Sequence, residues 1–519
     1  MAVFAFTAAG HADELSDIQA QAKQLREQNQ ALAKRLADLE KRQQKIEKQQ
    51  PTAASGNLAE AMAADLPYKA AVKAPALAND DLCWHGVCVY GNIDMGLNYQ
   101  NHGAPLSPLS VGPLNYLVSK NSLGSYFGVG PNQLSTSFIG LRGKQEIADG
   151  LYAVFNLQTQ FDPASGQISN GVGAVQANNG LGLAQQTGFS DSSKAGQAFN
   201  GAAYAGLSSP IYGTLTYGRQ NALSSDLVTN YDALGGSNAW SVLTYQGASG
   251  GGGDTEDRIY DNSFEYRVNV GPVRFAVETQ LRNGGNSGTG NAFEGDVGFD
   301  YMGLSMDFIG GKIYDAVSAS PLSTAQVNML TASTVPVGLG AVAATISDNT
   351  VFQVAAKYTI GPVKLFAGYE HIDFANPNNP LTPGAFIEGG YTVFAPTNNN
   401  FTTDKILQVF WAGAKYSVRS DIDLAVAYYH ESQNSFVNAS NPTGTCTTVA
   451  ASSCSGSLDA VSLVGDWRFA KHFDAYAGIM WSQVQNGLAN GFALANGLPG
   501  GTGNKASAFD PGVGLRYQF

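Results

Sequence analysis

From Val87 to the carboxyl terminus, apolar and polar side chains alternate with a period of two in one segment after another. In the first segment, 87–100, the odd positions read Val, Val, Gly, Ile, Met, Leu and Tyr, and the even positions are mostly polar. Successive side chains of a strand point to opposite faces, so each segment is expected to be a strand with one apolar and one polar face. Sixteen such segments occur, at 87–100, 134–147, 151–161, 201–209, 212–220, 258–268, 272–282, 292–301, 304–314, 351–359, 363–372, 405–417, 422–430, 459–469, 473–483 and 507–519.

The connections between these segments alternate in length. Short ones, such as Asp149-Gly150 and Gly361-Pro362, alternate with long ones rich in Gly, Ser and Asn. An even number of strands with short turns at one end and long loops at the other is typical of transmembrane β-barrels. The predicted fold class is therefore all-β, a 16-stranded antiparallel transmembrane β-barrel over residues 83–519. Its closure would pair every backbone donor and acceptor that lipid cannot satisfy.

A soluble all-β sandwich would also alternate, and it is the alternative architecture. Against it, aromatic residues stand on the apolar face beside the turns, where a membrane barrel has its interfacial girdle. These aromatic residues are Tyr301, Tyr358, Tyr369, Tyr416, Trp467, Phe469 and Phe473.

Composition excludes several other classes of protein. Charged residues make up only 13% of the chain, yet no stretch reaches the roughly 18 consecutive apolar residues that a membrane-spanning helix needs. The 26 Phe and 23 Tyr residues argue against a disordered chain. A formal net charge of -12 disfavours a nucleic-acid partner.

The amino terminus predicts export from the cytoplasm. Residues 1–12, MAVFAFTAAGHA, are apolar and end in small residues before the polar stretch that starts at Asp13. This pattern resembles the remnant of a secretory signal peptide with cleavage after Ala12, although no Lys or Arg precedes the apolar part.

Residues 13–50 carry a heptad pattern. From Leu15 to Ile46 the core positions recur at spacings of three and four without Gly or Pro, which predicts an α-helical coiled coil about 48 Å long. A single amphipathic helix packed on a globular core is the alternative. Pro51 ends the helix, and 51–82 is predicted as an Ala/Pro-rich linker. One hexapeptide resembles the Arg-h-x-x-h-Glu motif of trimeric coiled coils, and its predicted trimerisation residues are Arg35, Leu36, Leu39 and Glu40.

Four cysteines form two sequence-local pairs. Cys83 is close to Cys88, and Cys446 is close to Cys454, in a chain without a metal-type Cys/His spacing. Two disulfides in an oxidising compartment are predicted, and four free thiols are the alternative. No metal and no cofactor are predicted.

The chain ends with Leu515, Tyr517 and Phe519 on one strand face. This ending resembles the signal that the outer-membrane assembly machinery reads. The segments FIGLRG at 138–143, GTLTYGRQ at 213–220 and DNSFEY at 261–266 resemble three strands of one family. On these residues, 83–519 resembles the trimeric general porins of Gram-negative outer membranes, and the coiled coil lies outside the resemblance.

In that family, the third loop folds into the barrel and places acidic groups opposite a ladder of basic side chains. The resemblance implies a constriction loop at about 221–255, with Asp226 and Asp232 as its acidic candidates and with Arg142 and Arg219 on the wall.

Two departures from the family pattern bear on this constriction. The Pro-Glu-Phe-Gly-Gly loop tip of enteric members is replaced by residues 233–237, ALGGS, and Phe138 stands at a wall position that is often Arg. The waist is therefore expected to be less sharply polarised.

The polar faces of the strands also indicate a wet interior. They carry charged groups at Arg142, Lys144, Glu146, Asp261, Glu265, Arg274, Glu278, Asp296, Asp300, Asp307, Lys364 and Arg468. Burying such groups dry costs several kcal/mol each, whereas sixteen strands enclose an aqueous channel. The residues assigned to the pore wall and constriction are Arg142, Lys144, Arg219, Asp226, Asp232, Asp261, Glu265 and Arg274.

The predicted function is a passive diffusion channel for small hydrophilic solutes in the outer membrane. The predicted assembly is a homotrimer surrounded by lipids and lipopolysaccharide, with the coiled coil in the periplasm. The sequence holds no H-E-x-x-H or P-loop motif, and His430 is the single candidate for a barrel hydrolase, so no enzyme is predicted. A substrate-specific channel and a tether to peptidoglycan are the alternatives. The excess of acidic groups predicts a mild preference for cations.

Overall fold

The structure is a computed structural model. It describes residues 82–106, 116, 124–168, 198–243, 259–281, 291–320, 322, 327–329, 341–380, 386–388, 391–393, 397–439, 455–489 and 505–519. The predicted signal remnant, the coiled coil with its trimerisation residues and nearly all of the linker lie outside these residues. So do Cys446, Cys454 and 244–255 of the predicted constriction loop.

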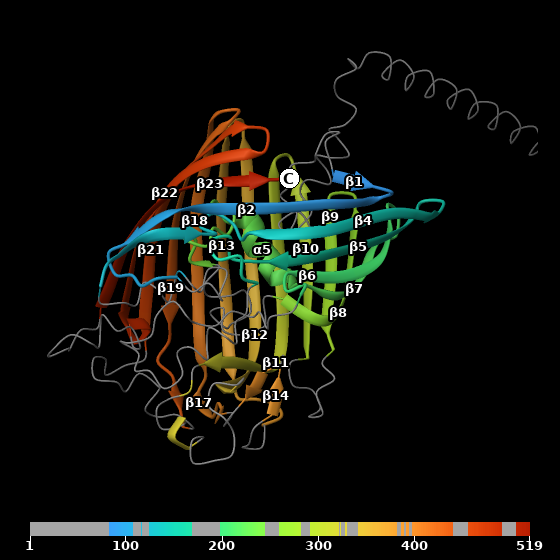
Figure 1. The fold of residues 1–519 in the computed structure, drawn as a ribbon. Helices are drawn as coiled ribbons and strands as arrows, with labels where there is room; N and C mark the ends of the chain where they lie inside the picture. Colours follow the sequence, from blue (N-terminus) through green and yellow to red (C-terminus); the bar gives the residue numbers. More distant parts are fainter. Residues whose placement is uncertain are drawn as a thin grey trace, which may run out of the picture. The chain divides into compact units, whose positions relative to one another are not determined.

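Sixteen long strands form one closed antiparallel barrel in the described part of the chain (Figure 1). Each pairs with the next along this series, and β23 pairs back onto β2, which closes the sheet. The predicted 16-stranded antiparallel barrel is confirmed. The strands are β2 (Val87–Gln100), β4 (Phe138–Ala148), β5 (Leu151–Gln160), β6 (Ala202–Ser209), β7 (Gly213–Asn221), β8 (Ile259–Val270), β9 (Val273–Gln280), β10 (Ala292–Tyr301), β11 (Leu304–Ser320), β12 (Ala341–Ile360), β13 (Val363–Ala375), β18 (Lys405–Arg419), β19 (Ile422–Gln433), β21 (Gly456–Ala470), β22 (Phe473–Asn486) and β23 (Lys505–Gln518).

Several short elements accompany the sixteen strands. One α-helix, α5, follows β7 and is described below with the functional site. No helix in the described ranges is long and apolar enough to cross a membrane. The remaining short elements are β1 (Leu82–Trp84), β3 (Tyr126–Pro131), β14 (Phe386–Glu388), β15 (Tyr391–Val393), β16 (Thr397–Asn398), β17 (Phe401–Thr403), β20 (Val437–Asn438) and the 3-10 turn η4 (Gly487–Ala489).

The predicted strand at 134–147 begins later, at Phe138, and a further strand precedes it. β4 pairs with the first half of β2, and β3 pairs with the second half. Between them, the backbone N–H groups of Leu134 and Ser135 donate to the Asp94 carboxylate at 2.9 and 2.7 Å. Because these two N–H groups bond to a side chain, they cannot pair with a neighbouring strand. β4 therefore starts after them.

The strands β11 and β12 extend well past their predicted ends at the long-loop side. β11 continues to Ser320 and β12 starts at Ala341, and the two remain paired beyond a bulge between Ile313 and Ala316. These extensions fall in segments that lack the strict apolar alternation of a lipid-facing strand. Their pairing therefore could not be recognised from periodicity.

The apolar faces of the strands point outward. On β2, Met95 and Leu97 are exposed, whereas Asn92, Asp94 and Asn98 are buried. The same division holds on β23, where Val513 and Leu515 are exposed and Asp510 is buried. Apolar groups therefore face the surroundings and polar groups face the enclosed side.

The two ends of the barrel meet at β2 and β23. Phe519 exchanges backbone hydrogen bonds with Gly91, at 3.1 and 2.8 Å. A Cβ at Gly91 would lie 2.5 Å from the Phe519 ring, so only glycine leaves room for it. The ring of Tyr517 lies between the rings of Phe473 and Phe519, with centroid distances of 4.7 and 5.5 Å.

The first described residues form a hairpin clipped by a disulfide. Cys83 on β1 and Cys88 on β2 are register partners, and their sulfur atoms are bonded. His85 and Gly86 make the turn with positive φ values of 49° and 79°. The hairpin holds the start of the barrel wall beside the carboxyl terminus.

Candidate functional site

A segment that follows β7 crosses the inside of the barrel. It comprises α5 (Leu223–Tyr231) and continues to Leu243, and we call residues 222–243 the inner loop. α5 begins after Ala222, whose carbonyl accepts from Asp226 N, and ends at Asp232, whose N–H donates to the Val228 carbonyl. α5 contacts β9 to β13, and the rest of the loop bonds to β19, β21 and β23. Only a segment inside the ring can reach strands on so many sides (Figure 1).

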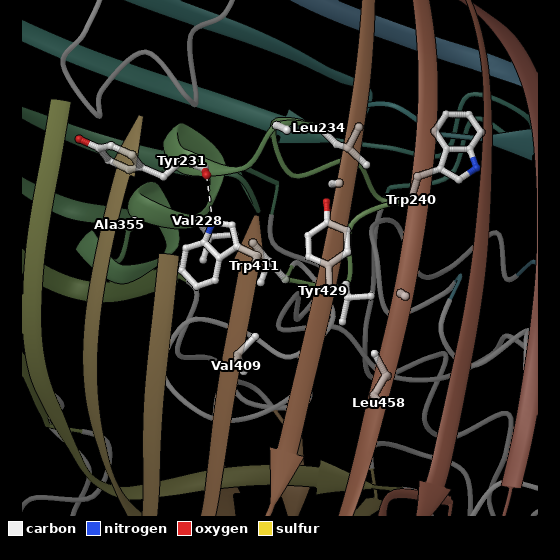
Figure 2. Packing of buried hydrophobic residues seen from close by; sticks show 14 of the residues in the cluster. Val228, Tyr231, Leu234, Trp240, Ala355, Val409, Trp411, Tyr429 and Leu458 are labelled. Carbon is white, nitrogen blue, oxygen red and sulfur yellow. Dashed lines mark hydrogen bonds between the residues drawn. The ribbon is translucent and has the colours of Figure 1, made fainter. Parts of the chain in front are cut away.

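The inner loop packs an apolar surface against the inner wall. Figure 2 shows Tyr231, Leu234 and Trp240 of the loop beside Trp411 of β18 and Tyr429 of β19. All five side chains are buried. Wall and loop side chains of this cluster include Val228, Leu243, Ala355, Val409, Ala427, Leu458 and Ala460. At about 25 cal/mol per Å², burial of this apolar area is the main force that holds the loop inside.

Glycines on the wall receive the two indole rings. Gly478 on β22 and Gly512 on β23 are register partners, and a Cβ on either would lie 2.6 and 3.1 Å from the ring of Trp240. Gly368 on β13 faces Trp411 in the same way, at 2.0 Å. The absent glycine side chains make room for the indole rings. They therefore fix the positions of Trp240 in the inner loop and of Trp411, the wall residue that donates to the Tyr231 carbonyl.

Hydrogen bonds fix the polar edges of these aromatic contacts. The Trp411 indole N–H donates to the Tyr231 carbonyl at 3.0 Å, the bond drawn in Figure 2. The Trp240 indole N–H donates to the Asp510 carbonyl at 3.1 Å. The Tyr429 hydroxyl donates to Asp232 at 2.7 Å. Buried polar groups need such partners, so these bonds specify one position of the loop.

The wall beneath α5 has the opposite character. Glu265 of β8, Glu278 of β9 and Glu294 of β10 are direct register partners and form a row of three carboxyl groups. Cβ atoms of such partners lie about 5 Å apart, and like charges there repel one another. Neither carboxylate oxygen of Glu278 has a hydrogen-bond partner among the described residues, and its residue is 2% exposed.

Arg267 and the first turn of α5 supply cationic and neutral hydrogen-bond donors to the carboxyl groups of this row. Arg267 binds Glu265 at 2.5 Å and Asp226 of α5 at 2.8 Å, with its side chain 12% exposed. Ser224 donates to Glu294 through its backbone N–H at 2.9 Å and its hydroxyl at 2.6 Å. The acidic wall is therefore tied to the helix by one cation and by neutral donors.

The other end of α5 meets a second arginine. Arg274 of β9 pairs with Asp307 of β11 at 2.7 Å and with Asp300 of β10, and it donates to the Tyr231 hydroxyl at 3.1 Å. The ammonium of Lys357 lies 5.3 Å from the centre of the Tyr231 ring. Tyr231 thus contacts cations from two strands, which orients its ring toward the wall.

Charges alternate on the inner face of β18 to β23. Arg516 pairs with Asp474 at 2.5 Å and lies 3.7 Å from Asp466. Asp423 binds Arg468 at 2.8 Å and Lys415 at 3.2 Å. Such charges are sustainable only where water or partners reach them, as in a hydrated lumen.

The two carboxyl groups of the inner loop have raised pKa values. Burial raises the pKa of Asp226 to about 7; Arg267 opposes this rise and Glu265 adds to it. Burial also raises the pKa of Asp232, against the hydrogen bonds from Tyr429 and from the Gly236 N–H. Asp226 of the inner loop therefore binds a proton near neutral pH.

The predicted wall residues occupy several environments. Arg142 and Lys144 lie over the rings of Tyr90 and Tyr152, at 4.9 and 4.3 Å. Arg219 pairs with Asp261 at 2.6 Å, and its guanidinium also donates to the Asn200 carbonyl.

The acidic candidates of the loop contact other residues than the predicted arginines. Asp226 contacts Arg267, and Asp232 contacts Tyr429. Arg267 was not singled out from the sequence, although it shares the polar face of its strand with Glu265. The glycine seats of the indoles had no sequence signal, since Gly478 and Gly512 are 34 positions apart.

The residues that the structure describes contain no candidate metal site. No group of three or more His, Cys, Asp and Glu side chains in these ranges is arranged to hold a metal ion. His430, the candidate weighed for catalysis, lies 2.8 Å from Asp459, which also accepts from the Tyr428 hydroxyl.

A closed ring of sixteen strands with apolar side chains outside, charged side chains inside and a loop packed across the interior defines a transmembrane β-barrel of the porin class. The comparisons with known proteins agree. The family model of the Gram-negative porins matches residues 59–487, and the chain belongs to this family as a Gram-negative outer-membrane porin.

Individual relatives are distant. An outer membrane porin protein of Bordetella pertussis is 26% identical over 149 residues, which span 29% of this chain and 31% of that relative. The anion-selective porin from Comamonas acidovorans has 16% identity and a TM-score of 0.52, covering 83% of this chain and 99% of its own. OmpT, an outer membrane protein of Vibrio cholerae, has 14% identity and a TM-score of 0.49, covering 85% and 100%.

Proposed function

We propose that the protein is a water-filled channel for passive diffusion of small hydrophilic solutes and ions across the outer membrane. The observation that carries the proposal is a charged inner face within a closed barrel, narrowed by the inner loop. Charge pairs such as Arg516 with Asp474 and Asp423 with Lys415 line that face.

The test is single-channel recording in planar bilayers. The purified protein is expected to insert in discrete conductance steps that persist in symmetrical KCl. Protein that inserts into the bilayer, as judged by protease protection, but gives no steps would contradict the proposal.

The channel is proposed to prefer cations mildly. The support is the excess of acidic over basic side chains on the polar faces of the strands, where carboxyl groups such as those of Asp261 and Asp300 remain accessible. A reversal potential of cation sign is expected in a KCl gradient, and a chloride-favouring potential would refute the preference.

The pore wall and constriction are proposed to comprise two sets of residues. The acids of the inner loop, Asp226 and Asp232, form one set. The other set consists of Arg142, Lys144, Arg219, Asp261, Glu265 and Arg274. Charge reversal at Lys144, which is exposed on the inner face, should shift the reversal potential further toward cations.

The assembly is proposed to be a homotrimer in contact with outer-membrane lipids and lipopolysaccharide. The carboxyl-terminal residues Leu515, Tyr517 and Phe519, which end the closing strand, support recognition by the assembly machinery. Mass measurement of the purified complex tests the trimer, and Phe519→Ala should lower its yield in the outer membrane.

The segment 13–50 is proposed as a trimeric coiled-coil stalk in the periplasm. Its heptad spacing and the motif at Arg35 to Glu40 support the proposal. A tether to peptidoglycan is the second role of this segment. Deletion of 13–50 should leave conductance intact, and envelope detachment in that variant would favour the tether.

A further inference from the structure

Two glycines leave a depression in the outward face of β10 and β11. Gly295 and Gly310 are register partners on the face that carries the exposed side chains of Phe293, Val297 and Phe308. A Cβ added to either glycine would have no atom within 4 Å. The floor of this depression is therefore bare backbone.

Three other outward glycines in the described strands are covered by neighbouring side chains. The ring of Phe519 lies over Gly91, the ring of Phe155 lies over Gly143, and Leu424 reaches Gly465. Among the strand glycines in the described ranges, open space surrounds Gly295 and Gly310 alone.

Large side chains stand around this floor without filling it. We call the site the glycine depression. Its floor is Gly295 and Gly310, and its rim is Val277, Phe293, Val297, Phe308 and Phe352. All five rim side chains are exposed. An apolar hollow with no atoms opposite its walls forfeits dispersion contacts, which a hydrocarbon group would restore.

The shape of the depression fits a chain rather than a compact group. The rows that contain Phe293 and Val297 are four residues apart along β10, about 13 Å at about 3.3 Å per residue, which leaves room for an extended acyl chain between their side chains. The rows above and below are closed by Phe293 and by Val297 with Phe308. A chain can therefore lie between these rows, across the backbone of both strands.

A cation stands at one end of the depression. Lys312 is the next residue after Gly310 on the outward face of β11, and its ammonium lies 4.8 Å from the centre of the Tyr314 ring. The Tyr314 ring in turn lies 6.3 Å from that of Phe293. The ammonium is 3.9 Å from Asp348, whose other oxygen accepts from two backbone N–H groups.

The depth of Lys312 follows from the topology. The short turn after Tyr301 marks the periplasmic end of β10 and β11, and Lys312 is eight residues from the start of β11 at Leu304. It therefore lies toward the outer leaflet, where lysine extends its ammonium to the headgroups.

We infer that the glycine depression binds an acyl chain of an outer-leaflet lipid whose phosphate groups give it a net negative charge, of the lipid A type. The chain lies on Gly295 and Gly310 between the phenylalanine rings. The Lys312 ammonium donates to the phosphate of the same lipid, with Tyr314 beside it. The inference rests on the membrane position of the barrel, and it is independent of conductance.

Native mass spectrometry of the full-length protein in detergent, titrated with diphosphoryl lipid A or with phosphatidylcholine, tests the inference. Wild type should bind lipid A in preference to phosphatidylcholine. Gly310→Leu fills the floor and should weaken lipid A binding at least about tenfold, since several buried methylenes are displaced at about 0.8 kcal/mol each. Lys312→Gln should lower lipid A binding to the phosphatidylcholine level and leave phosphatidylcholine binding unchanged.

Gly465→Leu is the matched control, since it adds the same side chain to the outward face of β21. It should bind lipid A as wild type does. Heat-modifiable gel migration and unchanged conductance check that each variant is folded, and Gly295→Ala, a smaller change, replaces Gly310→Leu if that variant does not fold. The inference is overturned if Gly310→Leu binds lipid A as tightly as wild type does. It is also overturned if Gly465→Leu loses as much lipid A affinity as Gly310→Leu. It is also overturned if the floor variant loses its oligomeric state without lipid, because the occupant is then a second copy of the chain.

Discussion

The inner loop meets two walls of different kinds. Against β8 to β11, α5 contacts a row of carboxyl groups through Arg267 and Ser224. Against β18 to β23, the rest of the loop contacts aromatic and aliphatic side chains, with Trp240 seated on two glycines. The charged contacts depend on complete pairing and on pH, whereas the apolar contacts depend on shape. We therefore expect loss of a charge to weaken the contacts with β8 to β11, and a change of side-chain shape to weaken the contacts with β18 to β23.

The largest effect is expected from Arg267→Gln. The substitution leaves Asp226 and Glu265 facing Glu278 without their shared cation. Breaking a buried pair in this way costs about 3 to 5 kcal/mol. Urea unfolding in lipid vesicles, followed by tryptophan fluorescence, measures the loss.

Arg419→Gln is the control for this change, because Arg419 pairs with Asp421 on the exposed rim. It should leave the unfolding midpoint unchanged. Equal midpoints for the two variants would show that the charged wall contributes nothing to the fold.

A smaller loss is expected from Trp240→Phe on the apolar wall. The change keeps an aromatic ring on Gly478 and Gly512 but removes the donor to the Asp510 carbonyl, at a cost of about 1 to 3 kcal/mol. Single-channel recordings should also show more frequent current fluctuations as the loop loosens. Trp467→Phe, at an exposed indole, should do neither.

Ser462→Ala tests a single bond of the same wall. The Ser462 hydroxyl donates to the Trp240 carbonyl at 2.7 Å, and its removal should cost about 0.5 to 1.5 kcal/mol. Ser507→Ala, at an exposed position of β23, is the matched control and should leave the midpoint in urea where it is.

Asp226→Asn is expected to change the pH dependence of stability. The pKa of Asp226 is about 7 in the folded protein and about 3.8 when unfolded, so the folded state binds the extra proton between these values. Asp226 therefore makes its full contribution to the free energy of unfolding below about pH 4. This contribution falls as pH rises toward 7, by at most about 1.4 kcal/mol per pH unit.

In the asparagine variant this falling slope should be absent. Asp421→Asn is the control, since the hydrogen bond from Arg419 lowers the pKa of Asp421 to about 2 and its titration lies below this window. An unaltered slope in Asp226→Asn would assign the pH dependence to other groups.

The barrel was predictable because its signal is local. Each strand alternates over its own length, as at 87–100, and the sixteen segments match sixteen strands. Alternation predicts the start of β4 four residues before Phe138, because the inward bonds of Leu134 and Ser135 to Asp94 depend on a strand about 40 residues earlier in the chain. The segments predicted as a stalk and as a second disulfide are not described.

The site was less accessible to sequence reasoning. A constriction loop at this place and its acids Asp226 and Asp232 came from a family resemblance. Their partners Arg267 and Tyr429 did not, since each reaches the loop only after the barrel has closed. No sequence pattern distinguishes Trp411 and Trp240 from other aromatic residues, because the glycines that they pack against lie on other strands.

By itself, the sequence determined where the chain forms strands and which face of each strand is apolar, because a period of two is set by strand geometry and does not depend on the partner strand. The tertiary structure alone decided what crosses the interior, which carboxyl groups share Arg267 and which glycines remain uncovered on the outer surface. Those facts depend on register between strands that are far apart in the chain, and register is fixed only when the sheet closes.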